Sequence, residues 1–366
     1  MIPYNRIAIL GLGLIGSSVA RAVKQHKLAH YVAAFDTSEH AISYMLEQKL
    51  VHSVNAYAGQ AVLGADLIIF ATPPGNFESL ARDIAPFVQE GALITDVASV
   101  KRYAVSAIKT NLPAYAHYVP AHPIAGSERT GPEAGKADLF AGKKIILTPE
   151  EGDVMSRPVA DARTFWQALG AKIEFMPAAL HDHIYAYVSH LPQLVAYAAQ
   201  ESLRDIPAPG SETFTRFTRL AASDAVLWAD ICLANTDFIL EALNEFILFA
   251  TQISGELSEN TASPANGTDV RAVLFSKIVA TCLIATVSLL EDRTGIHPAS
   301  YTGSGFTDMT LPAREDPESA LAAISEHHHT LAPMLKTALQ HLHDIKSALQ
   351  SPEKLLPLLI SLQKTT

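Results

Sequence analysis

The sequence predicts two regions, a mostly parallel, doubly wound α/β sheet and an all-helical C-terminal part. Apolar runs of strand length alternate with helical patterns until about residue 176, and strand signals stop after about residue 178. The chain has 366 residues, which favours more than one domain, and 49% of them are apolar, which is enough for a large core. We expect an α/β domain over 1–178, a helical substrate domain over 179–256 and a second helical unit over 257–366.

The alternation in the first region is typical of units in which a helix joins two parallel strands. Ligands bind such sheets at the carboxyl ends of the strands. The expected strands are 6–11, 31–36, 66–72, 92–97, 117–120, 143–148 and 172–176, and the expected helices are 14–26, 38–49, 77–89, 100–110 and 156–169.

A glycine-rich turn follows the first expected strand, where residues 7–16 read IAILGLGLIG. Gly11 permits the tight turn, Gly13 lets a pyrophosphate approach the backbone, and Gly16 lets the helix pack on the strand. The helix N-terminus favours the diphosphate. This predicts a Rossmann-type sheet, with cofactor contacts expected from Gly11, Gly13, Leu14, Ile15, Gly16, Asp36, Thr72, Pro73 and Pro74.

An acid ends the second expected strand, twenty positions after the last glycine of the motif. Asp36 is placed to accept the ribose hydroxyls. It is followed by Thr37, Ser38 and Glu39, without the arginine that a 2′-phosphate needs. We therefore expect NAD rather than NADP as the cofactor. The alternative to nucleotide binding itself is a glycine-rich turn between strand and helix that holds no ligand.

The composition restricts the partners and the compartment. The formal net charge is −10, which argues against nucleic acid or an anionic membrane and leaves a small-molecule substrate. Cys232 and Cys282 lie in apolar helical stretches, and we expect buried free thiols and no metal site. No signal peptide is recognisable, and the longest apolar run, 278–290, is too short to span a bilayer. We expect a cytoplasmic protein.

Two segments at strand ends carry residues suited to chemistry. In DVASVK, Ser99 stands where a strand ends and a helix starts, so it either contacts a ligand or caps the helix. Lys101 lies in the first helical turn, against the dipole preference, which indicates a specific partner or simple exposure. In AHPIAGSE, His122 precedes a proline that keeps it out of helical geometry. Its imidazole is suited to accept a hydroxyl proton, and a purely structural histidine is the alternative.

The helical part adds a polar stripe and an arginine pair. On the expected helix 179–198, one face carries His190 and another carries Ser189 and Gln193, which predicts either a buried polar network or a pocket wall. Arg216 and Arg219 stand one turn apart, so one of them could clamp a carboxylate through two hydrogen bonds.

Taken together, these segments resemble the prephenate/arogenate dehydrogenase family of tyrosine biosynthesis. The combination of motifs in this order is specific, whereas each motif alone is not, and the resemblance covers about residues 5–255. The matching motifs are GLGLIGSS at 11–18, DVASVK at 96–101, HPIAGSE at 122–128, HD and SHLP within 181–192, TRLAASD at 218–224 and WADI at 228–231.

The resemblance implies an oxidoreductase of the 6-phosphogluconate-dehydrogenase-like architecture. Such an enzyme transfers hydride from C4 of a cyclohexadienyl ring to NAD and releases the ring carboxylate as CO2. His122 and Ser99 would be catalytic, with His122 taking the proton of the C4 hydroxyl. The substrate-binding residues would be Arg219, His190, Gln193, Ser189, Glu128 and Lys101.

Two departures from the family pattern leave the substrate open between prephenate and arogenate. Gln193 stands where the family often has histidine, and Ser211, Glu212 and Thr213 replace a glycine-rich stretch before the arginine. The rival functions are another hydroxyacid or imine oxidoreductase of the same architecture, and a non-catalytic NAD-sensing protein. The first would need a catalytic lysine or a glycine-rich serine segment in the helical part, where we find neither.

The helical part contains an apparent internal repeat. Residues 214–224, FTRFTRLAASD, match 306–316, FTDMTLPARED, at five of eleven positions with an offset of 92. In the second copy Leu311 replaces Arg219 and Cys282 replaces His190, as a copy kept only for packing would show. We expect a monomer in which this copy replaces a partner subunit, a pseudo-dimer; a homodimer is the alternative.

Overall fold

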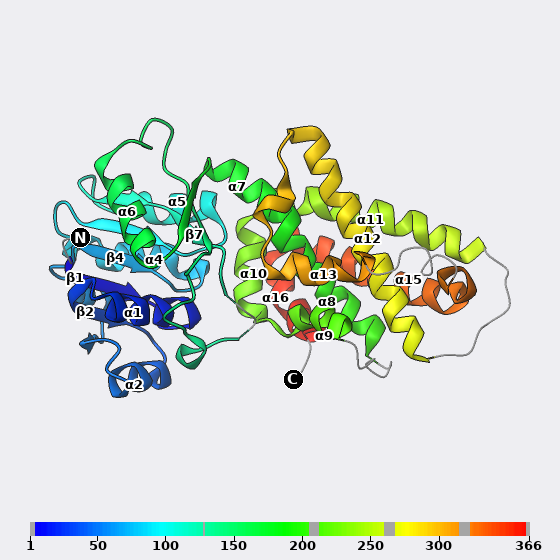
Figure 1. The fold of residues 1–366 in the computed structure, drawn as a ribbon, viewed down its shortest axis with the longest axis horizontal. Helices are drawn as coiled ribbons and strands as arrows, with labels where there is room; N and C mark the ends of the chain where they lie inside the picture. The colour runs from blue at the N-terminus through cyan, green and yellow to red at the C-terminus, as the bar shows by residue number, and fades with distance from the viewer. Residues whose placement is uncertain (1–3, 127–128, 205–211, 260–267, 315–322, 364–366) are drawn as a thin grey trace. The chain divides into compact units, whose positions relative to one another are not determined.

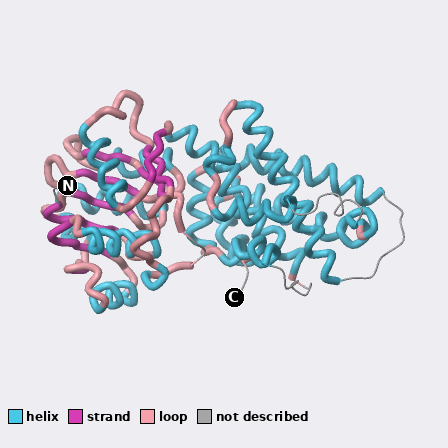
Figure 2. The backbone as a smooth tube through the Cα atoms, in the orientation of Figure 1, coloured by secondary structure: helices cyan, strands magenta, loops and turns pink. Residues whose placement is uncertain are grey.

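The chain folds into two compact units, Met1–Asp182 and His183–Thr366 (Figure 1). The described strands all lie in the first unit, and the described regular elements of the second unit are all helices joined by loops (Figure 2). This confirms the predicted fold class. The two helical regions predicted over 179–256 and 257–366 share one compact unit. The computed structural model describes residues 4–126, 129–204, 212–259, 268–314 and 323–363.

A six-stranded parallel sheet lies at the centre of the first unit, in the order β3-β2-β1-β4-β5-β6. All four residues of β4 are fully buried, as expected for a strand covered on both faces. The order reverses between β1 and β4, which is the point where sheets of this type bind dinucleotides. The strands are β1 Tyr4–Leu10, β2 Ala29–Phe35, β3 Ser53–Val54, β4 Leu67–Phe70, β5 Leu93–Asp96 and β6 His117–Val119.

The helices of the first unit follow the predicted positions within a few residues. The exceptions are α3, which sequence periodicity did not indicate, and the predicted helix 77–89, which ends early and continues as the 3₁₀ turn Ala85–Phe87. The helices are α1 Leu14–His26, α2 Glu39–Glu47, α3 Ala58–Val62, α4 Phe77–Ile84, α5 Lys101–Lys109, α6 Arg157–Ala168 and α7 Ala178–Tyr185.

A second, three-stranded sheet follows the first, in the order β7-β8-β9. It consists of β7 Ala121–Pro123, β8 Lys144–Leu147 and β9 Lys172–Phe175. The strands expected over 143–148 and 172–176 therefore exist but do not extend the parallel sheet, because β7 pairs with β8 in antiparallel direction. Pro120 separates β6 from β7, and its carbonyl oxygen accepts a hydrogen bond from the Thr148 amide at 3.0 Å.

The second unit begins within the last residues of α7, passes through a π-helical turn and continues as α-helices. Pro192 lies in the first turn of α8, directly after the π turn, a position in which a proline is tolerated. The elements are the π turn Ala186–His190, α8 Leu191–Leu203, α9 Glu212–Thr218, α10 Ala225–Ala234, α11 Thr236–Glu259, α12 Thr268–Thr294, α13 Ser304–Arg314, α15 His328–Leu349 and α16 Pro352–Leu362.

The helix α12 is longer than the apolar run that predicted it. Its segment Arg271–Thr294 has a mean hydropathy of 2.2 over its most apolar stretch and is long and apolar enough to cross a membrane. The sequence argument that this part of the chain is too short to do so is therefore wrong. However, α12 packs against α11, α13 and α15, and Phe275, Leu283 and Leu290 are fully buried. These are the surroundings of a core helix.

Candidate active site

The glycines between β1 and α1 have different structural roles. Gly11 has φ +104°, and a Cβ there would lie 2.6 Å from the backbone carbonyl of Ala71. A Cβ at Gly16 would lie 1.9 Å from the Gly11 oxygen, so both positions need glycine for the fold itself. A Cβ at Gly13 would meet no atom within 4 Å. The space above Gly13, at the N-terminus of α1, therefore fits the approach of a phosphate to the backbone.

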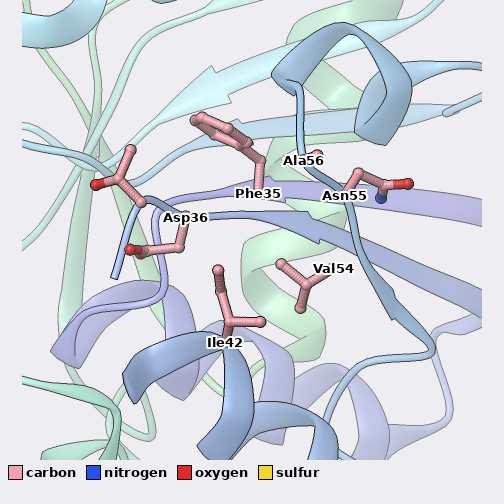
Figure 3. A pocket seen from close by; sticks show the side chains of 7 residues that line it. Phe35, Asp36, Ile42, Val54, Asn55 and Ala56 are labelled. Atoms are coloured by element: carbon pink, nitrogen blue, oxygen red, sulfur yellow. The ribbon is translucent and has the colours of Figure 1, made fainter. Parts of the chain in front are cut away.

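The Asp36 carboxylate lies at the carboxyl end of β2 and holds the glycine turn in place. Its Oδ2 accepts a hydrogen bond from the Leu12 amide at 2.6 Å, and its Oδ1 accepts one from the Ser38 amide at 2.8 Å. A cavity of about 510 Å³ opens beside it, and none of its lining residues is basic (Figure 3). The cavity is lined by Phe35, Asp36, Thr37, Ile42, Val54, Asn55 and Ala56.

The carboxyl end of β4 lies next to this turn, because Ala71 packs against Gly11. The hydroxyl of Thr72 is buried, and it makes no hydrogen bond within the part of the chain that the structure describes. Pro73 and Pro74 follow, and Pro74 starts a short 3₁₀ turn. Thr72 thus offers a hydroxyl to a ligand on the side of the sheet where cofactor contacts were predicted.

The structure does not support the substrate contact predicted for Lys101. This side chain is fully buried, forms an ion pair with Asp96 and donates a hydrogen bond to the Ala121 oxygen at 2.5 Å. Burial lowers the pKa of Lys101, and the neighbouring Asp96 opposes this shift. Because its ammonium contacts no solvent and two internal acceptors hold it, Lys101 supports the fold and does not bind substrate.

The Asp96 carboxylate joins three segments of the first unit. Asp96 accepts hydrogen bonds from the amides of Ala98 at 2.9 Å and Ala121 at 3.1 Å, and from the Tyr118 hydroxyl at 2.8 Å. Burial, and then the adjacent Asp96 charge, raise the pKa of Tyr118. The Asp96–Lys101 pair therefore ties β5 and α5 to β7, which carries His122.

The N-terminus of α5 is capped by a residue distant in sequence. Asp182, in α7, accepts hydrogen bonds from the Lys101 amide at 2.7 Å and the Arg102 amide at 2.8 Å. Ser99 lies outside the helix and is partly exposed, and its hydroxyl makes no hydrogen bond among the described residues. The interpretation of Ser99 as the cap of this helix is therefore wrong, and its hydroxyl is available to a ligand.

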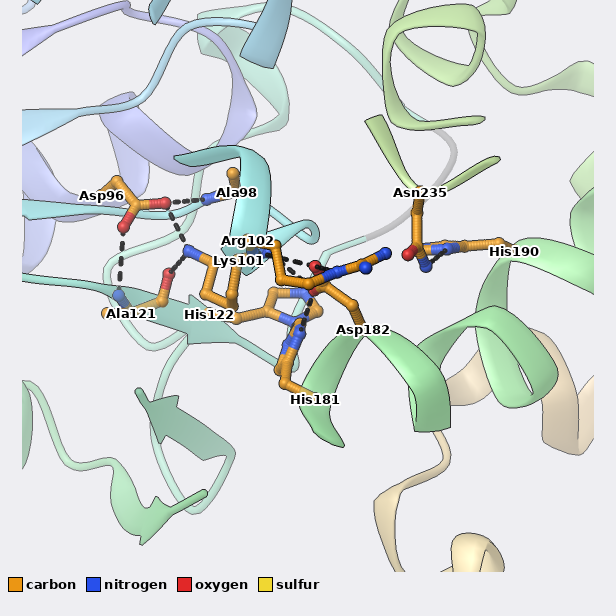
Figure 4. A network of polar contacts seen from close by, with 10 residues as sticks. All are labelled: Asp96, Ala98, Lys101, Arg102, Ala121, His122, His181, Asp182, His190 and Asn235. Atoms are coloured by element: carbon orange, nitrogen blue, oxygen red, sulfur yellow. Dashed lines mark hydrogen bonds and ion pairs between the residues drawn. The ribbon is translucent and has the colours of Figure 1, made fainter. Parts of the chain in front are cut away.

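His122 lies inside β7 and belongs to a buried chain of three side chains (Figure 4). Its Nδ1 is 2.8 Å from His181 Nε2, and His181 Nδ1 is 2.8 Å from Asp182 Oδ1. His181 and Asp182 are fully buried, and His122 is 9% exposed. Sequence reasoning singled out His122 but gave no role to His181 and Asp182, although the adjacent pair was visible in the HD motif.

The polar stripe predicted on the first helix of the second unit separates into different environments. His183 stacks on Phe238 with ring centroids 4.4 Å apart, whereas His190 Nδ1 is 3.2 Å from the Asn235 side-chain nitrogen. The π turn adds a residue to the helical turn and so rotates the later residues away from the face expected for an α-helix. Ser189, within this turn, is partly exposed.

Gln193 and Arg219 are connected to the same short element, the 3₁₀ turn Arg219–Ala222. The Gln193 side-chain amide donates to the Leu220 oxygen at 2.7 Å. Arg219 Nε is 2.6 Å from Asp308 Oδ2, and its Nη2 donates to the Ser304 hydroxyl at 3.0 Å. The arginine predicted to bind a substrate carboxylate thus already contacts a carboxylate of α13. The other predicted contact, Glu128, lies outside the described residues.

The strand order, the glycine turn and the acid after β2 define a dinucleotide-binding protein of the Rossmann type. Comparison with known sequences adds the family. Residues 19–175 match the nucleotide-binding domain of prephenate dehydrogenase, and residues 177–265 match its dimerization domain. The chain belongs to the prephenate dehydrogenase family. Residues 266–366 lie outside both matches.

Individual relatives agree with this assignment. The chain is 36% identical to cyclohexadienyl dehydrogenase of Zymomonas mobilis over 255 residues, which is 68% of this chain and 86% of that protein. It is 30% identical to prephenate dehydrogenase of Bacillus subtilis over 253 residues, or 66% of this chain and 67% of that protein. The crystal structure of Aquifex aeolicus prephenate dehydrogenase with hydroxyphenyl propionate and NAD+ is similar, with a TM-score of 0.62 and 27% identity, and the match covers 70% of this chain and 92% of that one.

Proposed function

We propose that the chain is an NAD-dependent dehydrogenase that oxidises prephenate, arogenate or both and releases the ring carboxylate as CO2. The observation that carries the proposal is the His122 imidazole, which is anchored through Nδ1 in a short strand that follows the dinucleotide-binding sheet. Family membership supports the reaction, and Asp36 without a basic neighbour at 37–39 supports NAD over NADP.

The chemistry asks little of the protein beyond orientation and one proton transfer. NAD, when bound, accepts the hydride from ring carbon C4. His122 takes the proton of the C4 hydroxyl, so that this carbon becomes a carbonyl. The bond between the ring and its carboxylate then breaks, CO2 leaves, and the electron pair enters the ring, which becomes a phenol after proton uptake. Aromatisation drives this last step, so no separate acid is required to expel CO2.

The remaining predicted residues are proposed to bind and orient the substrate. Ser99 shares the contact with the C4 hydroxyl, and its hydroxyl has no competing partner among the described residues. Arg219 binds a substrate carboxylate, with Ser189, His190 and Gln193 as further substrate contacts. Holding the ring in one orientation toward the cofactor is a large part of the rate enhancement in such reactions.

The test is the rate of NADH formation with prephenate and with arogenate, first in the unmodified protein and then in His122→Asn. We expect the variant to bind NAD normally and to lose about 10²- to 10⁴-fold in turnover, the usual contribution of a general base. His117→Asn is the matched control, because His117 is an exposed histidine on β6 of the same unit. Near-normal turnover in His122→Asn would make this histidine structural. No NADH formation with either substrate would favour a non-catalytic NAD-binding protein.

We also propose that the helical unit is an internal pseudo-dimer. The boundaries of its helices follow the sequence repeat: α9 and α13 begin at Glu212 and Ser304, and α11 and α15 begin at Thr236 and His328, each 92 positions apart. The segment 92 positions after α8 lies at the end of α12.

The packing of these helices is reciprocal, which supports the pseudo-dimer. Each of two elements packs on its own counterpart, α9 on α13 and α11 on α15. The other contacts come in exchanged pairs: α8 packs on α15 as α12 packs on α11, and α8 packs on α13 as α12 packs on α9. This is the pattern of a two-fold interface, in which the same patch is used by both partners.

The pseudo-dimer predicts a monomer in solution, because the second copy already covers the surface of the dimerization domain. Sedimentation of the full chain at micromolar concentration tests this. A single species at the mass of one chain, 39.3 kDa, is expected. A stable dimer whose interface is built from α8, α9 and α11 would mean that residues 268–349 do not replace a partner subunit.

We propose a soluble, cytoplasmic location. The core packing of α12 supports it, since the longest apolar helix is covered by α11, α13 and α15. Recovery of the activity in the soluble cell fraction is expected, and a chain that requires detergent for extraction would contradict the proposal.

A further inference from the structure

We propose that His181 and Asp182 are positioning residues that fix the tautomer of His122, so that its Nε2 carries the lone pair that accepts the substrate proton. The inference rests on the proposed role of His122 as the proton acceptor. It gives a function to the connected side chains of His122, His181 and Asp182 (Figure 4). Neither the fold nor the glycine motif requires these contacts.

The first step is the charge of Asp182. Four hydrogen-bond donors converge on its carboxylate: the amides of Lys101 and Arg102, the Arg102 Nε at 3.3 Å, and the ring of His181. A protonated carboxyl would place a hydrogen against one of these donors. The carboxylate is therefore ionised, and the N-terminus of α5 stabilises the negative charge.

The second step is the direction of the hydrogen bonds. An ionised Asp182 can only accept, so His181 Nδ1 donates to its Oδ1. In a neutral His181, Nε2 is then the acceptor. The contact of 2.8 Å to His122 Nδ1 requires one donor, and that donor is His122 Nδ1–H. A neutral imidazole has one proton, so His122 Nε2 carries the lone pair.

The third step is what happens when His122 takes the proton. The imidazolium keeps its Nδ1–H donated to His181, and His181 remains bonded to the negative Asp182. The chain of contacts thus places a fixed negative charge two side chains from the developing positive one, inside the protein, where such interactions are stronger than in water. His181 and Asp182 are fully buried, so water does not replace them. The proton stays on His122, and no transfer along the chain is needed.

A purely structural role is the competing explanation, because Asp182 also caps α5. Asp182→Asn separates the two. An NH₂ group in the Oδ2 position would face two donors, the amide and the Nε of Arg102, so the asparagine oxygen takes this position and keeps both contacts. The NH₂ group then takes the Oδ1 position, where the Lys101 amide loses its acceptor and His181 Nδ1 meets a donor. This reverses every hydrogen bond of the chain: His181 Nε2–H donates to His122 Nδ1, and His122 is protonated at Nε2. In the analogous serine-protease triad, the same aspartate-to-asparagine change costs about 10⁴-fold through the wrong tautomer.

The decisive measurement is nitrogen NMR of the protein labelled at histidine. We expect His122 Nε2 of the unmodified protein to be unprotonated and the same atom of Asp182→Asn to be protonated. This readout needs no substrate and is independent of activity. A protonated Nε2 in the unmodified protein at neutral pH would overturn the proposal directly, even if every variant failed to fold.

Kinetics provide the second arm. Asp182→Asn should lower kcat by about 10²- to 10⁴-fold, with little change in NAD binding and in KM. The lower limb of the pH profile of kcat should move to lower pH in this variant. His181→Gln retains an oxygen that can accept from His122 Nδ1 and should recover part of the activity lost in His181→Leu. If His181→Gln and His181→Leu lose activity equally, and the lower limb of the pH profile does not move in Asp182→Asn, then His181 and Asp182 only support the fold.

These outcomes are distinguishable from a failure of the proposed function. If His122→Asn keeps its turnover, the histidine is not the base and the proposed mechanism fails. If His122→Asn is inactive but Asp182→Asn keeps both the turnover and the tautomer of the unmodified protein, the mechanism stands and only the positioning role is wrong.

Discussion

Replacing Lys101 by methionine tests whether the Asp96–Lys101 pair holds the site in place. Both side chains are fully buried, and the ammonium also donates to the Ala121 oxygen. Methionine fills a similar volume but leaves the Asp96 charge without its cation. Removing one partner of a buried ion pair costs about 3–5 kcal/mol. Three other donors remain on Asp96, from Ala98, Tyr118 and Ala121, so we expect a loss within this range.

The pair also makes a specific prediction for the double variant. Adding Asp96→Asn to Lys101→Met removes the unpaired charge, so the double variant should be more stable than Lys101→Met alone. Lys109→Met is the matched control on the same helix, because Lys109 pairs with Glu150 at 2.5 Å but both side chains are about half exposed. Exposed pairs of this kind contribute little to stability.

Denaturant unfolding monitored at Trp166 is the appropriate assay. This residue is fully buried in the first unit, and Trp228 of the second unit can be replaced by phenylalanine in every variant, so that the signal reports the first unit alone. A shift of the midpoint at constant slope measures the change in stability. A loss below about 1 kcal/mol in Lys101→Met, or a double variant less stable than the single one, would refute the assignment of a buried ion pair.

Other predictions concern the cofactor, the substrate and the thiols. Asp36→Ser should raise kcat/KM with NADP relative to NAD, and equal use of both cofactors by the unmodified protein would contradict the role of Asp36. Arg219→Gln should raise KM with a smaller effect on kcat. Asp308→Asn removes the carboxylate now bound to Arg219 and should lower KM. An unchanged KM in both variants would mean that the Arg219–Asp308 pair is only a contact between helices. Burial raises the pKa of Cys282 from 9.0 to about 12, so its thiol should resist thiol reagents at pH 9 until the protein unfolds. The raised pKa also means that the contribution of the protonated Cys282 thiol to stability is complete below pH 9 and is lost between pH 9 and 12. Fast labelling of the native protein at pH 9 would contradict the burial of this thiol.

The parts of the fold that the sequence predicted are those set by local patterns. The strands of the parallel sheet are short apolar runs, and the turn between β1 and α1 depends on glycines within six residues of one another. The second sheet was not predicted, because β7 has three residues and its antiparallel pairing with β8 depends on residues more than twenty positions away. Hydrophobic periodicity carries no information about which strands pair.

The errors at the site have a common physical origin. The position of Lys101 at a helix start indicated either a specific partner or exposure, and the family resemblance implied a substrate contact; the partner is Asp96, five residues earlier on the preceding strand. The roles of His181 and Asp182 depend on contacts with residues about 60 and 80 positions away in sequence, which no local pattern reveals. The sequence shows Asp96 close to Lys101, so a partner for this lysine was visible in it. The contacts of His181 and Asp182 are visible only in the tertiary structure.

The sequence differences between the two helical segments of the proposed pseudo-dimer agree with that proposal. In a two-fold homodimer, a residue near the axis faces its own copy, so a charged residue there meets the same charge. Arg216 and Asp308 occupy equivalent positions of the repeat, and the Arg216 Nη1 is 3.9 Å from the Asp308 Oδ1. Opposite charges at equivalent positions are possible only when the two copies have separate sequences. Asp308 also binds Arg219. In the proposed pseudo-dimer, the second copy has Leu311 at the position equivalent to Arg219 and supplies a charge to the arginine of the first copy.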